Sequence, residues 1–330
     1  MIENINKIVE NYGFKVKNYY RGRGAHICET NKGVKLLKEM ETTVNRTWFE
    51  FYVKKHLIEK GFTDVDQFNL VEDKPFYELN DKKYILKDWC TGRECNLYDE
   101  KETIQAVENL AKIHKGLQNV SFPEHSVVYS NLGDLTYNLK RHTNELKKVR
   151  KYIRNKSHWS EFDILFLKNY SYYYSKAKES INGFEVSDYN SLVKDAQSKG
   201  QVCHGQYTQH NVLLTNSSTM TVNFEKSCLD LQIMDLYHFI RKVMEKNNWN
   251  ANYGMKMIEA YNKVNSLDQD GLEILYFTLL YPEKFWKIAN YYFNTRKAWE
   301  PKLSLEKLQK IITQKETKHE FLSMLEKSCK

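Results

Sequence analysis

The residues best suited to chemistry gather between positions 204 and 225. His204, Gln206 and Asn211 lie in one polar segment, and Asn223 and Glu225 follow shortly after. A histidine can transfer protons, and side-chain oxygens can bind Mg²⁺. Gln206, Asn211 and Asn223 are neutral amides, which have no useful basicity near neutral pH and are poorer Mg²⁺ ligands than carboxylates. The group therefore offers one carboxylate, Glu225, and one histidine, for which bonding to the backbone is the plainer role.

A short strand pair is expected to position these side chains. The sequence predicts strands at 212–214 and 220–222, joined by the turn Asn216-Ser217-Ser218-Thr219. The polar segment precedes the first strand and Asn223 follows the second, so the hairpin brings them close together. Glu225 shares a side with Asn223 only if the strand continues regularly, and in that case it is a substitute metal ligand.

The first third of the chain predicts a small antiparallel sheet with one helix. Tyr19–Met40 is predicted to be a hairpin that turns at Asn31-Lys32-Gly33. Gly22 and Gly24, just before the hairpin, let the backbone approach a phosphate group. A helix over 43–60 and strands over 68–71, 75–79 and 83–89 complete this part.

From about residue 93 the chain is predicted to be mostly helical. Apolar residues at helical spacing mark a helix at 104–117. The other predicted helices cover 131–154, 160–182, 188–199, 235–248, 254–265, 270–280, 283–298 and 303–328.

This order of elements resembles that of protein-kinase-like phosphotransferases. The run from His204 through Gly205 and Gln206 to Asn211 resembles the catalytic loop of the aminoglycoside phosphotransferase and choline kinase superfamily, whose pattern is H-G-D, four residues and N. In that pattern the Asp receives the proton of the acceptor hydroxyl and the Asn binds magnesium. Val222-Asn223-Phe224-Glu225 resembles the superfamily's I-D-F-E, whose Asp holds the metal.

The resemblance implies a two-lobed, kinase-like α+β fold. A small antiparallel-sheet N-lobe with one helix would cover residues 1–88, a hinge 89–92, and a large, mostly helical C-lobe 93–330. Lys38 resembles the phosphate-binding strand lysine, with Glu50 as its ion-pair partner, and Asp235 resembles the helix-capping Asp that supports the catalytic loop. The residues implied to bind nucleotide are Gly22, Gly24, Lys38, Glu50, Asp88, Trp89 and Cys90.

Aromatic segments near the C-terminus narrow the resemblance. Tyr281-Pro282-Glu283-Lys284-Phe285-Trp286-Lys287 and Lys297-Ala298-Trp299, together with Cys203-His204-Gly205, resemble the spore coat CotS-like family, over about residues 10–325. The resemblance implies a protein that is synthesised in the cytoplasm of the mother cell of a sporulating bacterium and deposited in the spore coat. Its partners would be other spore coat proteins.

Two departures from the superfamily pattern bear on activity. Gln206 stands at the position of the catalytic base and Asn223 at that of the metal-binding Asp. General-base assistance is typically worth about 10²- to 10⁴-fold in rate. We therefore predict a pseudokinase that acts as a structural or interaction module, in which ATP and magnesium bind weakly or not at all. Two alternatives remain: an active ATP-dependent phosphotransferase acting on a small-molecule or protein hydroxyl, and a nucleotide-binding switch without transfer.

Composition excludes several other classes. The chain has 330 residues, 41% hydrophobic, which supports a substantial core and excludes a disordered chain. Its net charge is +8, and the dense basic run from Arg141 to Lys156 is expected to be a solvated helix face, not a nucleic-acid site. No apolar stretch of about 18 residues and no signal peptide are apparent, so membrane insertion is not expected.

Overall fold

The computed structural model describes residues 2–294 and 301–329, so the Lys297-Ala298-Trp299 motif lies outside the described residues. The chain divides into two compact units. The first contains Met1–Asn96, Lys101–Ser130 and Lys199–Leu229. The second contains Leu97–Glu100, Asn131–Ser198 and Asp230–Lys330. The residues with a predicted catalytic, nucleotide-binding or metal-binding role all belong to the first unit, whereas Asp235, predicted to support the loop, belongs to the second.

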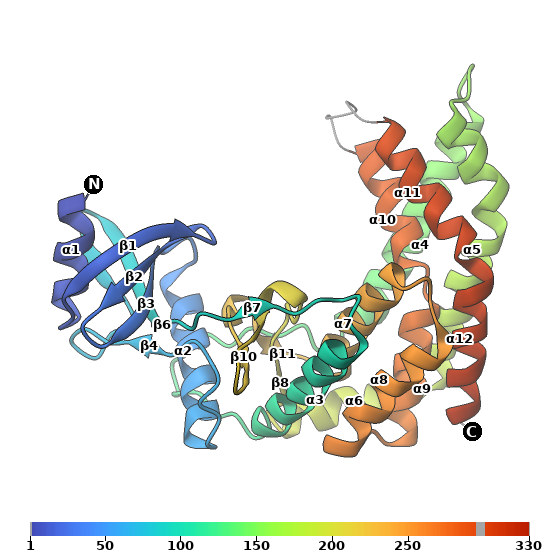
Figure 1. The fold of residues 1–330 in the computed structure, drawn as a ribbon. Helices are drawn as coiled ribbons and strands as arrows, with labels where there is room; N and C mark the ends of the chain where they lie inside the picture. The colour runs from blue at the N-terminus through green and yellow to red at the C-terminus, as the bar shows by residue number, and fades with distance from the viewer. Residues whose placement is uncertain (1, 295–300, 330) are drawn as a thin grey trace. The chain divides into compact units, whose positions relative to one another are not determined.

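The first unit is built on a six-stranded antiparallel sheet (Figure 1). Its main order is β1 (Val16–Gly22), β2 (Ala25–Thr30), β3 (Gly33–Glu39), β6 (Lys82–Asp88) and β4 (Phe68–Asn69), and β5 (Tyr77–Leu79) also pairs with β6. Helix α1 (Ile2–Asn11) precedes the sheet, and α2 (Val44–Glu59) is inserted after β3, as the sequence predicted. Thr43 caps α2 by accepting the backbone N–H of Arg46.

Strand alternation gives the sheet two different faces. Cys28, Leu37 and Leu86 pack on one face against the apolar side of α1. On β3 and β6 the register pairs Leu36 with Lys87, and these two side chains therefore share the opposite face. Lys38 lies on that same face, two residues beyond Leu36.

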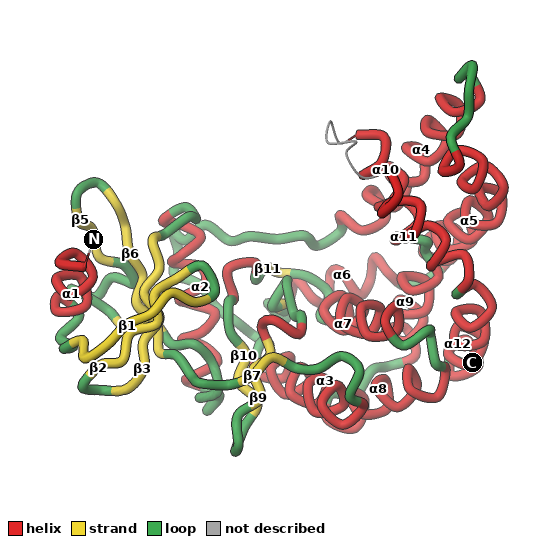
Figure 2. The backbone as a smooth tube through the Cα atoms, turned by 45° about the horizontal axis from the view of Figure 1, so that its top comes forward, coloured by secondary structure: helices red, strands yellow, loops and turns green. Residues whose placement is uncertain are grey.

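The rest of the first unit surrounds a short hairpin. Strands β9 (Val212–Leu214) and β10 (Thr219–Thr221) form a three-stranded sheet with β7 (Arg93–Glu94), separate from the large sheet (Figure 2). A second small sheet pairs β11 (Cys228–Leu229) with β8 (Val202–Cys203). Helix α3 (Glu100–Gly116), which begins at the unit boundary, and one-turn helices η1 (Gln209–Asn211) and η2 (Phe224–Lys226) complete this region.

The second unit is helical throughout its described residues. Its helices are α4 (Asp134–Arg154), α5 (Glu161–Val186), α6 (Tyr189–Ser198), α7 (Ile233–Lys246), α8 (Ala251–Val264), α9 (Gln269–Leu280), α10 (Glu283–Asn294), α11 (Pro301–Thr313) and α12 (Lys315–Ser328). Leu146, Phe166, Phe285 and Leu308 bring α4, α5, α10 and α11 into one core cluster. The observed order confirms the predicted α+β class, an antiparallel N-terminal sheet followed by a helical C-terminal part.

One sequence-based expectation was wrong in detail, and one condition that the sequence left open is not met. The helix predicted over 303–328 is two helices, because the chain breaks at Gln314, whose buried side-chain amide donates to the carbonyl oxygen of Glu245. The strand before Glu225 does not continue either: Asn223 has a left-handed backbone (φ 63°), and η2 begins at Phe224. No described helix is both long enough and apolar enough to cross a membrane.

Close packing in the second unit yields a stability prediction at Gly183, in the last turn of α5. A Cβ atom there would lie 2.2 Å from a ring carbon of Phe277 on α9. Gly183→Ala should therefore lower the free energy of unfolding by about 1–3 kcal/mol, although alanine favours helix by about 1 kcal/mol. Urea unfolding measures the change. Phe277→Leu in the same background should recover part of it, and a net stabilisation by Gly183→Ala would contradict the packing.

Candidate functional site

The loop that contains His204 is held by backbone hydrogen bonds to the imidazole ring. His204 is fully buried, and its Nε2 donates to the carbonyl oxygen of Val222 (3.0 Å) while its Nδ1 accepts the backbone N–H of Gln206 (3.2 Å). Both ring nitrogens are therefore occupied, which fixes one neutral tautomer. The histidine positions the loop against the end of the β9–β10 hairpin and has no ring nitrogen left for proton transfer.

The two amide side chains at the predicted metal positions bond to each other and to the backbone at the predicted base position. Asn223 donates its side-chain N–H to Oδ1 of Asn211 (2.9 Å), and Asn211 donates to the backbone carbonyl of Gln206 (3.0 Å). The left-handed backbone at Asn223, which asparagine adopts more readily than most residues, turns its side chain toward Asn211. The structure thus brings Gln206, Asn211 and Asn223 together as the sequence motifs suggested, in a chain of neutral hydrogen bonds.

The predicted phosphate lysine is paired with a carboxylate. The ammonium of Lys38 lies 3.2 Å from Oε1 of Glu225 and 3.6 Å from Oε2 of Glu41. The backbone carbonyl of Glu225 accepts the Nε–H of Arg46 on α2 (2.5 Å), which fixes this turn in place. Lys38 therefore contacts the Asn223–Glu225 turn, and the carboxylate of Glu225 balances the positive charge of the lysine.

Glu50 is not the partner of Lys38, which corrects the sequence-based expectation. Its Oε1 lies 2.5 Å from the ammonium of Lys54, one turn along α2, and 2.6 Å from that of Lys87 on β6. Lys87 shares the sheet face of Lys38 but lies nearer to α2, so it takes the carboxylate. Glu50 is also buried, not solvated on its helix.

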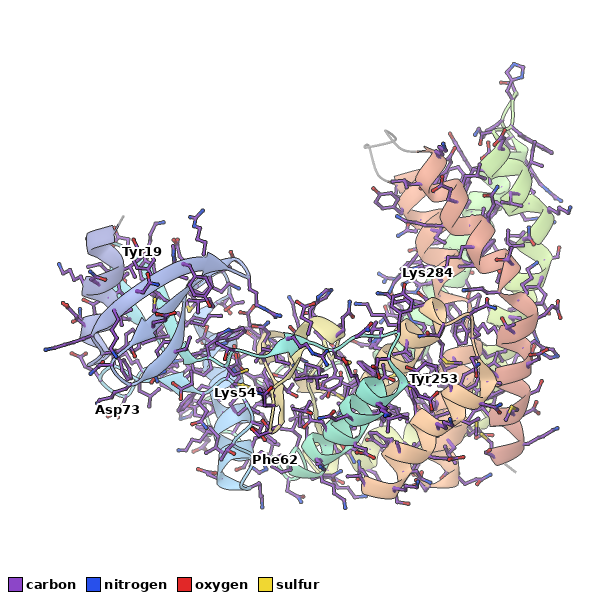
Figure 3. The ribbon with its side chains drawn as sticks, in the orientation of Figure 1. Tyr19, Lys54, Phe62, Asp73, Tyr253 and Lys284 are labelled. Carbon is purple, nitrogen blue, oxygen red and sulfur yellow. The ribbon has the colours of Figure 1, made fainter. Side chains whose placement is uncertain are left out.

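Asp66 completes a buried quartet of charges with Glu50, Lys54 and Lys87. Its carboxylate lies 2.8 Å from the ammonium of Lys54 and 3.6 Å from that of Lys87. Each of the four residues is at most 2% exposed, and Lys54 is labelled in Figure 3. Burial alone would raise the pKa of Glu50, but Lys54 and Lys87 lower it to about 2.

The quartet also reaches the metal-binding position. Asp66 Oδ2 accepts the backbone N–H of Asn223 (3.3 Å). The segment Asp64–Asp66 pairs with β10 as well, through an N–H···O bond from Thr221 to Asp64 (3.0 Å). The buried charges and the degenerate site are therefore one connected network.

A second network joins the glycine loop to the loop after His204. Arg23, between Gly22 and Gly24, donates to Glu94 (2.8 Å) and to the backbone carbonyl of His210 (2.7 Å). His210 in turn contacts the other oxygen of Glu94 (2.6 Å). We call these three residues, Arg23, Glu94 and His210, the Arg23 clasp. Arg23 and Gly24 both have positive φ, 54° and 71°, and the glycine accommodates this without strain.

The predicted hinge borders an open pocket. Trp89 packs on one side against Ala25, Ile27 and Leu36 and on the other against a cluster with Leu213. A pocket of about 670 Å³ adjoins it, lined by Val34, Trp89, Cys90, Thr91, Arg93, Leu214, Thr215, Asn216 and Ser217.

Some backbone N–H groups at the predicted hinge already form hydrogen bonds within the first unit. The N–H groups of Asp88 and Trp89 already donate to the carbonyls of Gln67 and Val34. The Asp88 carboxylate bonds to Lys35 and Asn69.

Asp235, predicted to support the loop, is buried in the first turn of α7 in the second unit. The sequence motifs gave no role to Lys54, Asp66, Lys87 or Glu94. Lys87 left a signal, a lysine inside an otherwise apolar strand, but nothing local marks Asp66 as the fourth charge.

The arrangement does not fit a magnesium–nucleotide complex. The donor set at the metal position consists of two amides already bonded to each other, and the neighbouring carboxylate, Glu225, is paired with Lys38. Mg²⁺ favours anionic oxygens in octahedral geometry. Among the described residues, no three His, Cys, Asp or Glu side chains are grouped so that they could hold a metal ion.

Known proteins with similar sequences indicate the family of this chain. A family model described as spore coat putative kinase YutH matches residues 5–325. The chain belongs to the YutH family of spore coat kinase-like proteins. The expected relation to spore coat kinase-fold proteins is thus confirmed. Spore coat protein S of Bacillus subtilis (strain 168) is 24% identical to this YutH-family chain, over 97% of the chain and 93% of the relative.

Solved phosphotransferases share the fold of this YutH-family chain. An aminoglycoside phosphotransferase from Alicyclobacillus acidocaldarius superposes with a TM-score of 0.86 at 20% identity, covering 98% of this chain and 95% of that one. Spectinomycin phosphotransferase APH(9)-Ia, solved with ADP and spectinomycin, gives a TM-score of 0.57 at 15% identity and covers 93% of each chain. The kinase-like fold predicted from the motifs is confirmed.

The quartet predicts a large stability loss when one charge is removed. Lys54→Met keeps most of the side-chain volume but leaves Glu50 and Asp66 with only Lys87 as a partner. Removing one member of a buried charge network typically costs about 3–5 kcal/mol. Urea unfolding should show a loss of this size. Lys55→Met, at the exposed neighbouring position of α2, is the matched control and should change stability by less than about 0.5 kcal/mol.

The loss should also depend on pH. Folding lowers the pKa of Glu50 from 4.5 to about 2, so its carboxylate stabilises the fold above pH 4.5 and this contribution is lost as the pH falls toward 2. The difference in the free energy of unfolding between wild type and Lys54→Met should therefore become smaller in acid. Equal stabilities of Lys54→Met and Lys55→Met at neutral pH would contradict the quartet.

Proposed function

We propose that this chain is a pseudokinase of the spore coat, a kinase-fold protein that acts as a structural or interaction module and does not transfer a phosphoryl group. The observation that carries the proposal is the hydrogen bond between Asn223 and Asn211, the two residues at the metal positions. Side chains that satisfy each other as neutral amides provide no anionic anchor for magnesium.

The chemical step would also lack a base. Gln206 stands where the superfamily motif has Asp, and an amide cannot take the proton of an acceptor hydroxyl near neutral pH. His204 cannot replace it, because both ring nitrogens are engaged with the backbone. An active phosphotransferase would therefore need Glu225 to leave Lys38 and bind metal, and no observation favours that exchange.

One observation favours a second candidate, a nucleotide-binding switch without transfer. The pocket beside Trp89 has a volume of about 670 Å³, and Lys38 remains to contact a phosphate. A bound nucleotide would have to displace Glu225 from Lys38 and open the Arg23 clasp. Binding of this kind would be independent of magnesium, which separates this candidate from an active kinase.

The family supports a setting for this module. We propose that the protein is made in the mother cell and deposited in the spore coat, where other coat proteins are its partners. The relative named spore coat protein S and the family model support this. A fluorescent fusion that remains diffuse in the mother cell throughout coat assembly would contradict it.

Calorimetric titration with ATP, with and without magnesium, tests the proposal. The wild type should show no magnesium-dependent binding, because the metal lacks an anionic ligand. Asn223→Asp should strengthen magnesium-dependent binding by about 1–3 kcal/mol, the scale of a charge-assisted contact. Gln206→Asp alone should do little, since that position would face the acceptor and not the nucleotide.

Asn119→Asp is the matched control. Asn119 is exposed and has a similar left-handed backbone (φ 56°), so the same substitution adds a charge away from the site. It should leave ATP binding unchanged. Tight magnesium-dependent binding by the wild type would overturn the pseudokinase proposal, and Glu225 would then be the first ligand to test.

A further inference from the structure

A pocket of about 50 Å³ lies within the second unit, formed by the ends of several helices. Its aromatic walls include Tyr173 of α5, Trp249 and Phe285. The segment Tyr281–Phe285, part of the C-terminal motif that the sequence analysis singled out, forms another wall. A single water needs about 10–15 Å³ of such volume, so the pocket holds a few waters or one small ion.

The pocket is lined by more positive than negative side chains. Five cationic residues line it, and the carboxylates on its wall are those of Glu245 and Glu283. The five cationic residues are Lys176, Arg241, Lys284, Lys315 and Lys318. Figure 3 labels Lys284, which lies in the first turn of α10.

The carboxylates are already committed. Glu245 pairs with Arg241 (2.7 Å) and Lys284 (3.3 Å), and Glu283 pairs with Lys287 (2.9 Å), which is not a lining residue. Lys176 pairs with Glu179 (2.9 Å). Among the described residues, Lys315 and Lys318 have no carboxylate within ion-pair distance, and the ammonium of Lys315 donates to the side-chain oxygen of Asn169. The lining therefore carries an excess of positive charge.

One buried donor at this pocket lacks an acceptor, and a lysine lies over an aromatic ring beside it. The Nε atom of Arg241 is buried and has no hydrogen-bond acceptor within the described part of the chain. The ammonium of Lys318 lies over the ring of Trp249, 4.9 Å from its centroid. Burial lowers the pKa of Lys318 to about 8. A buried donor without an acceptor is costly, and an anion here would accept the Nε–H of Arg241 and pair with the half-buried ammonium of Lys318.

We propose that this pocket binds a tetrahedral oxyanion, phosphate either free or as a monoester. Arg241 would contribute its Nε–H, and Lys315 and Lys318 their ammonium groups, so one small ion would meet three donors. Helices α10 and α12 begin at lining residues, Glu283 and Lys315, and their N-termini add partial positive charge. The proposal is independent of the pseudokinase assignment, which concerns the first unit.

Calorimetry with the full chain and inorganic phosphate tests this. At about 0.15 M ionic strength the wild type should bind one phosphate with a dissociation constant below about 1 mM. Lys318→Met and Lys315→Met should each weaken binding by about tenfold or more, the effect of losing a charged donor. Lys310→Met is the control, because Lys310 is exposed on α11 and does not line the pocket, and it should leave the affinity unchanged.

A second titration, with glycerol phosphate, distinguishes free phosphate from a phosphate monoester as the ligand. Tighter binding of the monoester would assign the site to a phosphorylated small molecule, and equal or weaker binding to the free ion. Undetectable binding of both by the wild type overturns the proposal. So does equal weakening by Lys310→Met and Lys318→Met, which would show a non-specific charge effect.

The pH dependence of binding is best measured with sulfate, because the charge of sulfate itself stays constant near neutral pH. The charged and titratable residues that line the pocket with Lys318 include Arg241 and Glu245 of α7, Lys176 of α5, and Lys315 and His319 of its own helix. Of these, Glu245 raises the pKa of Lys318, whereas Arg241 and Lys176 lower it. Sulfate affinity should fall several-fold as the pH rises through about 8, since Lys318 loses its proton. Lys318→Met should remove that dependence. An unchanged pH profile in the variant would contradict the role of Lys318.

Discussion

The buried ion cluster of Glu50, Lys54, Asp66 and Lys87 is the interaction on which the first unit depends. Four charges removed from water are tolerated only when each is closely paired, and here each carboxylate meets both lysines. The cluster joins α2 to β6 and, through Asp66, to the backbone N–H of Asn223. A rearrangement at the predicted metal position would therefore disturb this cluster as well.

This dependence explains why Lys38, Asn211 and Asn223 are paired with other protein groups. With Glu50 held by Lys54 and Lys87, Lys38 is left to Glu225, and the Asn223–Glu225 turn is fixed between Asp66 and Arg46. The side-chain amide of Asn223 then donates to that of Asn211, so each of these two residues has a protein partner.

The sequence predicted the fold better than the pairing within it. The turn at Asn31–Gly33 correctly located β2 and β3, and helical spacing located α2 and α3, because these signals are local. The Glu50 pairing was wrong, since its partners depend on sheet register and on Asp66, which follows α2 by several residues in a loop with no distinctive pattern. The position of Glu225 stayed open in the sequence for a different reason: β10 ends at Thr221 and Asn223 is left-handed, but asparagine is compatible with both conformations.

The central claim is that the site lacks a metal–nucleotide centre, and manganese binding tests it most directly. Electron paramagnetic resonance can count free Mn²⁺ in the presence of a non-hydrolysable ATP analogue, and Mn²⁺ accepts the same oxygen ligands as magnesium. The account predicts that adding wild-type protein leaves the spectrum of the Mn²⁺–analogue mixture unchanged. Stoichiometric loss of the free signal, together with a protein-bound spectrum that Asn211→Ala or Asn223→Ala abolishes, would contradict it.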